Sequence, residues 1–401
     1  MRLAFADSAA IIEVPDSWEL LAALGAAASD WPFVQTESMA EPVARVREFN
    51  GSYAIEIPGE EPIEATAVSA ACSAMVDVVG AYIDDNPGRL CLHCAGAVFA
   101  GRLVIFPSRA HAGKSTLIAR LAASGHVIFG DDILPLSDDD SSGVSLGIAP
   151  RLRLPLPKNS SAPFRKFVSR HATASDDRYL YLGLPEGGLA PRKSSMPIGA
   201  VVLLDRRQKG PAVLGLASRS VILQSLIMQN FARTAPAGQL LDRLHAVMGR
   251  LPRLVLGYSD LEEATALLER TFANWPPRLE ALGEPYALDV TSRDAEDEAV
   301  PDEPAGSDYP PGALLVQNPK VRLHEVDGEL FLADADGLSI HHLNLIGAGL
   351  WRLLAEPVSQ EQSVDVLCEA FPDADRQAIG DDVSRLFDAL SREGFVVPAP
   401  E

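Results

Sequence analysis

The residues whose types and spacing suggest chemistry lie between positions 108 and 132. At their centre, Ala112-Gly113-Lys114-Ser115-Thr116 separates an apolar run at 103–106 from an amphipathic stretch at 117–123, which predicts a strand, a loop and a helix. In such a loop, a small residue before the lysine lets backbone N–H groups close around phosphate oxygens. The lysine amine then reaches the β- and γ-phosphates, and the next hydroxyl binds Mg²⁺. The pattern predicts a nucleotide-binding loop made of Ser108, Arg109, His111, Ala112, Gly113, Lys114, Ser115 and Thr116.

The loop departs from the full phosphate-loop pattern at its first position. That pattern has two glycines, and the earlier of them would stand where this chain has Ser108. Gly113 is therefore the only glycine of the loop. The departure leaves a simpler interpretation open, in which a helix cap is followed by an ordinary acidic turn.

An acidic pair follows the loop after a helix-length spacing. Asp131-Asp132 comes directly after the apolar run 127–129, which predicts the end of a second strand. A phosphoryl-transfer site needs a carboxylate for Mg²⁺ and a base for the attacking hydroxyl, and two acids at a strand end supply both. The pair therefore strengthens the interpretation of the loop as a phosphate site.

Four features of this region occur in a characteristic order: His93 after a short strand, the phosphate loop, Gly125-His126 at the start of the next strand, and Asp131-Asp132. In this order the region resembles the catalytic domain of HPr kinase/phosphorylase and related proteins, which share a fold with ATP-dependent phosphoenolpyruvate carboxykinase. The resemblance is sharp between residues 90 and 135 and extends more weakly over 1–272.

The resemblance implies a role for each matching residue. Asp131 becomes the base toward a substrate serine, while Asp132 and Ser115 become the Mg²⁺ ligands. Arg153 is a looser match to a downstream family arginine. The implied cofactors are ATP and Mg²⁺, and the implied catalytic residues are Asp131, His93, Lys114 and Arg153.

The acidic charge of the chain is concentrated near its C-terminus. The formal net charge is −21, of which −3 falls in residues 1–275, −8 in 276–311 and −10 in 312–401. Nucleic acid and anionic membranes are poor partners for such a surface. A basic peptide fits it, although acidic segments more often only increase solubility. No apolar run approaches the ~20 residues that span a bilayer.

The number and positions of the cysteines indicate the cellular compartment and argue against a metal site. Four cysteines in 401 residues, without a signal-peptide pattern at 1–14, lead us to expect a cytoplasmic protein. A metal site at Cys91-Leu92-His93-Cys94 would need a second ligand pair at suitable spacing, and none is evident. Buried thiols on either side of a functional histidine are the favoured interpretation.

The last ninety residues contain the signals of a small separate domain. Two apolar runs, 321–326 and 329–334, flank Asp327-Gly328, which is a strong hairpin signal. Ser359 and Gln362 have the spacing of a capping box at a helix start. The patterns predict a third strand at 338–343 and helices at about 344–354, 361–370 and 379–392.

This order of three strands and three helices resembles the PqqD-like, winged-helix domain that recognises ribosomally made peptides. The matching residues are Val321-Arg322, Leu343-Asn344 with Gly347, Phe371-Pro372 and the ending 390–396. The resemblance implies that a leader peptide adds to the sheet as a strand and packs against the last helix. A winged helix can also bind DNA, but the charge of −10 disfavours this. The implied peptide-binding residues are Ile340, His342, Leu386 and Leu390.

We therefore expect an α/β protein with a P-loop-containing, HPr-kinase-like domain and a small α+β winged-helix domain. The expected divisions are an N-terminal part at 1–88, a nucleotide-binding part at 89–275, an acidic, proline-rich linker at 276–311 and the peptide-binding domain at 312–401. A helix is expected at 68–83, beneath the nucleotide-binding sheet. Long active-site loops are expected at 143–182. A homo-oligomer is possible by analogy with HPr kinases.

The two resemblances together suggest an ATP-dependent kinase that phosphorylates a serine on a precursor peptide captured through its leader. Three alternatives remain at this stage. One is a kinase for a folded carrier protein like HPr, which would not need residues 312–401. The second is a nucleotide-binding scaffold without catalysis, and the third is a small-molecule kinase.

Overall fold

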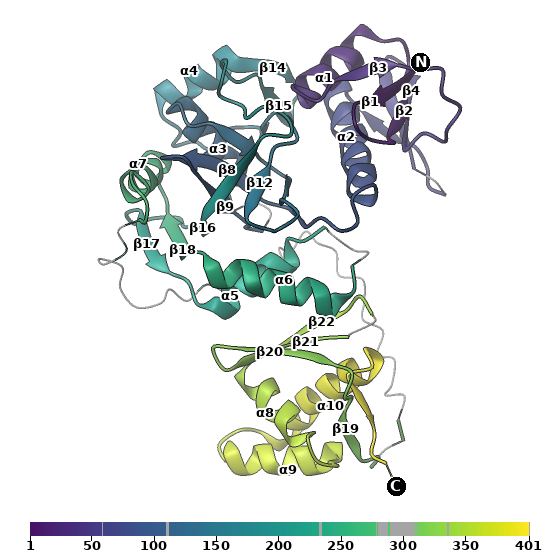
Figure 1. The fold of residues 1–401 in the computed structure, drawn as a ribbon, viewed down its shortest axis with the longest axis vertical. Helices are drawn as coiled ribbons and strands as arrows, with labels where there is room; N and C mark the ends of the chain where they lie inside the picture. The colour runs from purple at the N-terminus through teal and green to yellow at the C-terminus, as the bar shows by residue number, and fades with distance from the viewer. Residues whose placement is uncertain are drawn as a thin grey trace. The chain divides into compact units, whose positions relative to one another are not determined.

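The computed structural model describes residues 1–57, 59–109, 112–231, 235–277, 279, 288, 309–310, 312–334 and 337–400 (Figure 1). The chain divides into two compact units. The first unit comprises residues 1–218, 228–232 and 247–288, and the second comprises 219–227, 233–246 and 289–401. Most of the expected linker at 276–311 lies outside the described residues, as does His111 of the expected nucleotide-binding loop.

The first unit begins with a six-stranded sheet in the order β3-β1-β2-β4-β5-β6. Its neighbouring strands are antiparallel except for β2 and β4, which run parallel. Two helices pack on it, α1 (Trp18–Ala28) and α2 (Ala67–Asp84). The strands are β1 (Arg2–Phe5), β2 (Ile11–Glu13), β3 (Phe33–Gln35), β4 (Ala44–Phe49), β5 (Ser52–Glu56) and β6 (Ile63–Ala65).

Helix α2 belongs to this N-terminal layer. Val68, Ala71 and Val78 on its buried side share a core with Tyr53 of β5. The helix predicted at 68–83 is thus confirmed, but it packs mainly on α1, β4 and β5 rather than beneath the loop-bearing sheet. Within the described part of the chain it is the one helix long and apolar enough to cross a membrane, a test that core helices of soluble proteins also pass.

A second, mixed sheet carries the expected phosphate loop. Its order is β10-β8-β9-β16-β18-β17, with β12 also paired to β16. The central strands β9, β16 and β18 are parallel to one another, and the remaining pairs are antiparallel. The strands are β8 (Ala95–Phe99), β9 (Arg102–Phe106), β10 (Ile128–Gly130), β12 (Ser142–Val144), β16 (Ser195–Arg206), β17 (Val213–Leu216) and β18 (Arg253–Tyr258).

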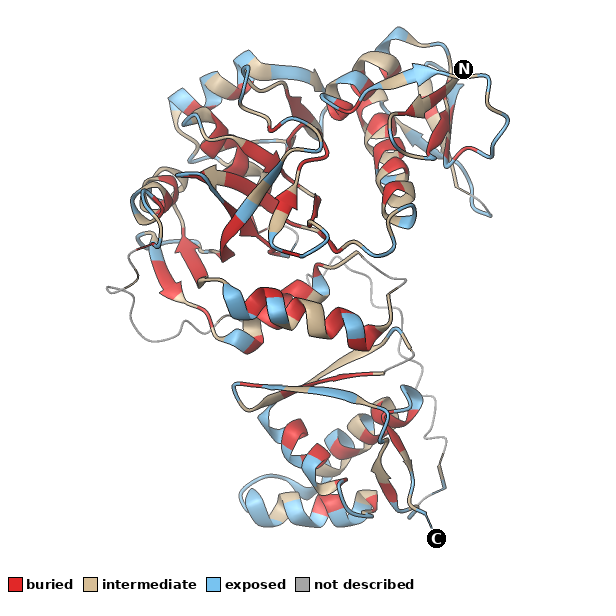
Figure 2. Cartoon of the chain, in the orientation of Figure 1, coloured by how far each residue is buried: buried red, intermediate tan, exposed pale blue. Residues whose placement is uncertain are grey.

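The strands of this sheet confirm the sequence predictions at 103–106 and 127–129 to within a few residues. Two helices pack against the sheet, α3 (Lys114–Ala123) and α7 (Leu261–Thr271). Figure 2 shows buried residues concentrated on these strands and on the inward sides of the helices. Leu117 and Leu121 of α3 meet Leu268 of α7 in this core.

The prediction of long loops at 143–182 is wrong. The segment contains helix α4 (Ala162–His171) and a three-stranded sheet in the order β13-β15-β14. Ser161 caps α4 by accepting the N–H of Phe164, whose buried ring packs with Leu152 and Leu182. The strands are β13 (Arg151–Arg153), β14 (Ala172–Ser175) and β15 (Tyr179–Leu182); β7 (Cys91–Leu92) pairs separately with β11 (Leu134–Pro135).

The second unit contains the predicted small domain. The hairpin over Asp327-Gly328, the third strand and all three helices are confirmed, and Ser359 and Gln362 form the predicted capping box. The sheet order is β20-β21-β22. The elements are β19 (Leu315–Gln317), β20 (Arg322–Val326), β21 (Glu329–Ala333), β22 (Ile340–Leu343), α8 (Leu345–Leu353), α9 (Gln360–Ala370), α10 (Arg376–Arg392) and β23 (Val396–Pro398).

The same unit takes in residues from two upstream helices, α5 (Arg219–Met228) and α6 (Ala237–Arg250). On α6, Asp242 accepts a hydrogen bond from His324 Nε2 of β20 at 2.7 Å. On α5, the Arg219 N–H donates to Asp327 at 2.7 Å. The small domain therefore folds together with segments that lie nearly a hundred residues before it.

Candidate functional site

The loop between β9 and α3 ends at Gly113, which has a φ of +92°. A β-carbon at this position would lie 2.5 Å from the Tyr258 hydroxyl, which itself donates to the carbonyl oxygen of Ala112 at 3.3 Å. Both the left-handed backbone and the close approach therefore require glycine here. The first N–H groups of α3 have no partner within the helix, which makes this end suited to an anion.

Lys114 is the first residue of α3, and its side chain is buried. Its amine donates to the carbonyl oxygens of Ser108 and, at 3.1 Å, Arg109. Burial lowers the pKa of Lys114, and the nearby carboxylates of Asp132 and Asp131 partly offset this. A positive charge is thus held inside the loop where phosphate oxygens would lie.

Ser108 stands where the phosphate-loop pattern has glycine, and its hydroxyl has a structural role. It is buried, and its Oγ accepts the N–H of Leu204 at 2.8 Å, which ties the end of β9 to β16. The serine therefore replaces the flexibility of a glycine with a fixed link between neighbouring strands.

The acidic pair follows directly after β10. Asp131 is buried; its Oδ2 accepts the N–H of Arg151 at 3.0 Å, and its Oδ1 has no hydrogen-bond partner among the described residues. Burial and the neighbouring Asp132 raise the pKa of Asp131 to about 7, against the lowering effects of the Arg151 N–H, the Ser115 hydroxyl and Lys114. A carboxyl group with a pKa near neutrality is suited to general-base chemistry.

Asp132 has a different environment from that of its neighbour. His93 Nε2 lies 3.6 Å from its Oδ1, and the Arg151 guanidinium lies 3.1 Å from its Oδ2. Although burial alone would raise the pKa of Asp132, His93 and Arg151 keep it below the usual value. The two acids thus differ in protonation: one is poised near neutrality and the other is held as a carboxylate.

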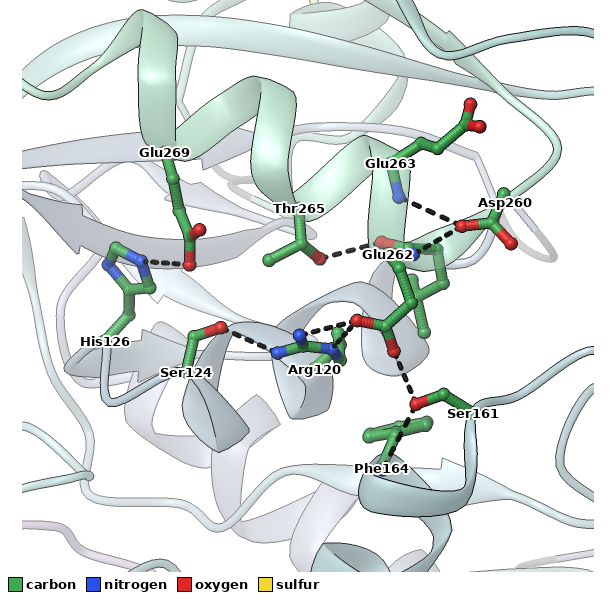
Figure 3. Close-up of polar contacts among 11 residues, drawn as sticks. Arg120, Ser124, His126, Ser161, Phe164, Asp260, Glu262, Glu263, Thr265 and Glu269 are labelled. Atoms are coloured by element: carbon green, nitrogen blue, oxygen red, sulfur yellow. Dashed lines mark hydrogen bonds and ion pairs between the residues drawn. The ribbon is translucent and has the colours of Figure 1, made fainter.

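Helix α3 is braced on the side away from the loop (Figure 3). Arg120 donates to Glu262 of α7 through Nε at 2.8 Å and through a second guanidinium nitrogen at 2.6 Å. Ser161, which caps α4, donates to the other oxygen of Glu262 at 2.6 Å. His126 Nε2 lies 3.4 Å from Glu269. These contacts fix the direction of α3, and hence the position of Lys114, through α4 and α7.

A cleft of about 430 Å³ opens at the start of α3. The structure brings seven of the expected residues to its wall: His93, Gly113, Lys114, Ser115, Thr116, Asp132 and Arg153. Ser108, Arg109 and Ala112 belong to the loop but do not line this cleft, and Asp131 lies on a neighbouring cavity that also includes His93 and Asp132.

Arg151 belongs to a basic stretch whose character suits phosphate or substrate, but no individual role was predicted for it. Its guanidinium contacts Asp132 and the sulfur of Cys72, and it lies 4.7 Å from the ring centre of Tyr179. Arg151 and Arg153 alternate with a buried Leu152 on β13, so an arginine-apolar-arginine strand pattern was the available signal. Arg206 at the end of β16 and Tyr179 also line the cleft without having been expected.

The residues of the cleft fit a nucleoside triphosphate with Mg²⁺. A buried lysine and a helix N-terminus suit phosphate oxygens, while the Asp132 carboxylate and the Ser115 hydroxyl are hard oxygen ligands. No group of three or more His, Cys, Asp or Glu side chains suited to a metal occurs in the described part of the chain. Mg²⁺ at phosphate sites commonly takes only one or two protein carboxylates beside substrate phosphates, so these residues are compatible with it.

The thiols flanking His93 are buried, as expected. Cys91 and Cys94 are free and fully buried, and burial raises the pKa of Cys91 to about 12. His93 is held by its backbone, whose N–H donates to the Gln229 carbonyl at 2.6 Å, and its ring stacks on Phe231. Both thiols therefore remain protonated, and the histidine is oriented toward Asp132.

The second unit has a groove of its own, of about 750 Å³, between β22 and α10. In the described sheet β22 pairs only with β21, so its other edge is open beside this groove. Ile346 and Phe371 offer exposed apolar side chains, with 50% and 46% of their surface accessible. An open strand edge next to apolar pockets is the geometry that binds an extended peptide.

Two of the four expected peptide-binding residues line this groove, His342 and Leu386. The other two need correction. Leu390 is fully buried, because α10 turns that side of the helix toward a core that includes Leu332, Trp351 and Phe395. Ile340 lies at the start of β22, outside the groove. Phe371 and Ile379 of the following segments also line the groove.

The comparisons with known proteins bear on this second unit. A search of curated proteins found no match. A solved structure of TbiB1 in complex with the TbiA(β) leader peptide is 22% identical and covers 21% of this chain and 99% of its own, with a TM-score of 0.20. That likeness is too low to carry an argument. The family model of coenzyme PQQ synthesis protein D (PqqD) matches residues 329–396. The chain is therefore a mixed α/β protein by its fold, and it contains a C-terminal PqqD domain.

Proposed function

We propose that this protein captures a precursor peptide on its PqqD domain and transfers the γ-phosphate of ATP to a hydroxyl of that peptide. The observation that carries the proposal is the presence, in one chain, of a PqqD domain and of a cleft that holds a buried lysine beside two unlike carboxyl groups. The PqqD match supports a ribosomally made precursor peptide as the partner.

The leader of the peptide binds in the groove between β22 and α10. Main-chain groups at the open edge of β22 supply hydrogen bonds, and the apolar pockets select side chains. Basic leader residues are favoured because the charge of 312–401 is −10. Capture raises the local concentration of the attached core peptide to about millimolar for a short flexible connection.

The transfer chemistry belongs to the cleft at α3. The substrate hydroxyl oxygen attacks the γ-phosphorus, the bond to the β–γ bridging oxygen breaks, and ADP leaves. Asp131 takes the hydroxyl proton, and Lys114 orients the phosphates. Mg²⁺, when bound by Asp132 and Ser115, supplies charge neutralisation on the phosphates. His93 and Arg151 hold Asp132 in its charged form.

A non-catalytic scaffold is the second candidate, and one observation favours it. The Lys114 amine donates to two carbonyl oxygens of its own loop, so it must exchange these partners to reach a phosphate. A scaffold predicts peptide binding with no ATP turnover.

The deciding experiment uses purified full-length protein, Mg-ATP and the short precursor-like peptides encoded nearest the gene, followed by intact mass. The proposal predicts a gain of one phosphate, ~80 Da, that is lost in Lys114→Met. Lys166→Met, an exposed lysine on α4, is the matched control and leaves the mass gain intact. Peptide binding without a mass change would favour the scaffold instead.

A further inference from the structure

A second cavity, of about 340 Å³, adjoins the loop cleft and is lined by both residues of the acidic pair. The two cavities share three wall residues, His93, Asp132 and Arg151, while Asp131 lines only the second. The volume is within the range of ligand pockets, roughly 300–1,000 Å³. A group in this second cavity would therefore reach the same carboxyl groups as a phosphate in the cleft.

The two cavities differ in chemistry. Arginine, lysine and backbone N–H groups surround the loop cleft, whereas the second cavity is lined mostly by aliphatic and aromatic side chains. Met75, Val79 and Ile83 of α2 form one wall, and Ile148 and Phe231 contribute to the others. Its charged groups are confined to the shared end, at His93, the two acids and Arg151.

Asp131 supplies an independent sign that a hydrogen-bond donor binds at this end. Its Oδ1 is buried and has no hydrogen-bond partner among the described residues, while its Oδ2 is occupied by the Arg151 N–H. A buried carboxylate oxygen without a donor is costly, and a substrate hydroxyl would satisfy it. The cavity thus combines one unsatisfied acceptor with an apolar interior.

We infer that this cavity binds the apolar side chain next to the acceptor hydroxyl, so that the site selects a serine or threonine flanked by a bulky apolar residue. The inference rests on the proposed function and names its substrate class. The hydroxyl lies at Asp131, the neighbouring side chain fills the cavity beside α2, and the phosphate approaches from the loop cleft. A polar flanking residue would lose its hydration in this cavity without gaining partners.

Gly80 allows a direct test of the cavity. It lies on α2 and lines the cavity, and a β-carbon at this position would meet nothing within 4 Å. Gly80→Phe therefore fills the cavity without a clash at its base. Gly25→Phe is the matched control, because Gly25 is also a helical glycine with no atom within 4 Å of a β-carbon, and it is exposed on α1.

The probes are two short peptides, Ac-Leu-Ser-Leu-NH2 and Ac-Asn-Ser-Asn-NH2, which differ in the polarity of side chains of similar shape. With full-length protein and Mg-ATP, we expect kcat/KM for the leucine peptide to be at least ~10-fold higher. Gly80→Phe should bring the ratio close to one, and Gly25→Phe should preserve it. Equal turnover of both peptides, or a preference that survives Gly80→Phe, would overturn the inference.

A binding measurement separates failure of this inference from failure of the proposed transfer. If neither these peptides nor a full precursor peptide is phosphorylated and no ATP is consumed, the kinase proposal fails. The cavity assignment is then tested by binding alone, which saturation-transfer NMR measures. The leucine peptide should not bind Gly80→Phe and should bind Gly25→Phe. Equal binding to both variants overturns the cavity assignment, and turnover of free 3-methylbutanol as fast as the peptide overturns the peptide as its occupant.

Discussion

The loop cleft of the first unit and the groove of the PqqD domain differ in the kind of groups that they offer to a ligand. The cleft and the cavity beside it hold charged groups at fixed positions: Lys114 lines the cleft, Asp131 lines the cavity, and Asp132 lines both. The groove is made of an open strand edge and apolar side chains from three helices. The proposed phosphate transfer would thus depend on single atoms, whereas peptide capture depends on a surface that tolerates different residues.

The largest expected effect is a loss of phosphate transfer in the cleft with no change of peptide affinity in the groove. Lys114→Met removes the only lysine of the loop and should reduce phosphate transfer by about 10³-fold. The affinity for a fluorescein-labelled precursor peptide, measured by polarisation, should stay the same, because the groove lies in the other compact unit. A parallel loss of peptide affinity would show that the two regions are not independent.

Asp131→Asn should reduce transfer by about 10²-fold, because the amide keeps the shape of the side chain but cannot accept the hydroxyl proton. Single-turnover rates with saturating peptide measure this step. Asp138→Asn is a suitable control, since Asp138 is exposed and lies outside the cleft. Unchanged transfer in Asp131→Asn would remove the assigned role of this residue.

Asp131→Asn should also stabilise the protein at alkaline pH. The pKa of Asp131 is raised in the fold from 3.8 to about 7, so its contribution to stability is present below pH ~4 and is lost as pH rises to about 7. The amide of Asp131→Asn carries no charge to bury, so at pH 8 we expect the variant to gain on the order of 2 kcal/mol in urea unfolding. At pH 3, below the unfolded pKa, the gain should nearly vanish. Asp132→Asn should instead destabilise at pH 8, since the pKa of Asp132 is lowered.

The smallest effect concerns the unusual first position of the loop. Ser108→Ala leaves the N–H of Leu204 without its acceptor and should cost about 1 kcal/mol in unfolding free energy. Urea unfolding of the full chain measures it. An unchanged midpoint would mean that the serine does not link β9 to β16 as described.

Local patterns predicted much of both regions. The strand, loop and helix around Gly113, and the acids that end β10, follow from hydrophobic periodicity and residue type. The hairpin at Asp327-Gly328 and the capping box at Ser359 are equally local signals. Each of these depends only on residues close together in the sequence.

Long-range pairing limited the remaining predictions. Arg151 reaches Asp132 because β13 pairs with β15, a register that the irregular composition of 143–182 does not signal. Helix α6 contacts His324, about eighty residues downstream, and no pattern within α6 identifies that partner. Leu390 was expected to bind peptide, but it lies in the core because the rotation of α10 is set by packing.

If the groove and the cleft act on one substrate, peptide binding in the groove should raise kcat/KM for phosphate transfer in the cleft. Ile346→Glu places a negative charge in the groove, at a half-exposed position. Leu345→Glu is the matched control, because it places the same charge at a more exposed neighbouring position outside the groove. Removing residues 312–401 is a poorer test, because it also uncovers the faces of α5 and α6 that contact the small domain.

The most direct measurement is kcat/KM for phosphate transfer to a full precursor peptide and to its core alone, with the wild type and these two variants. We expect the leader to raise kcat/KM by at least ~10-fold in the wild type and in Leu345→Glu, and to give no advantage in Ile346→Glu. Transfer that is equal with and without the leader in the wild type would contradict a kinase that works through peptide capture.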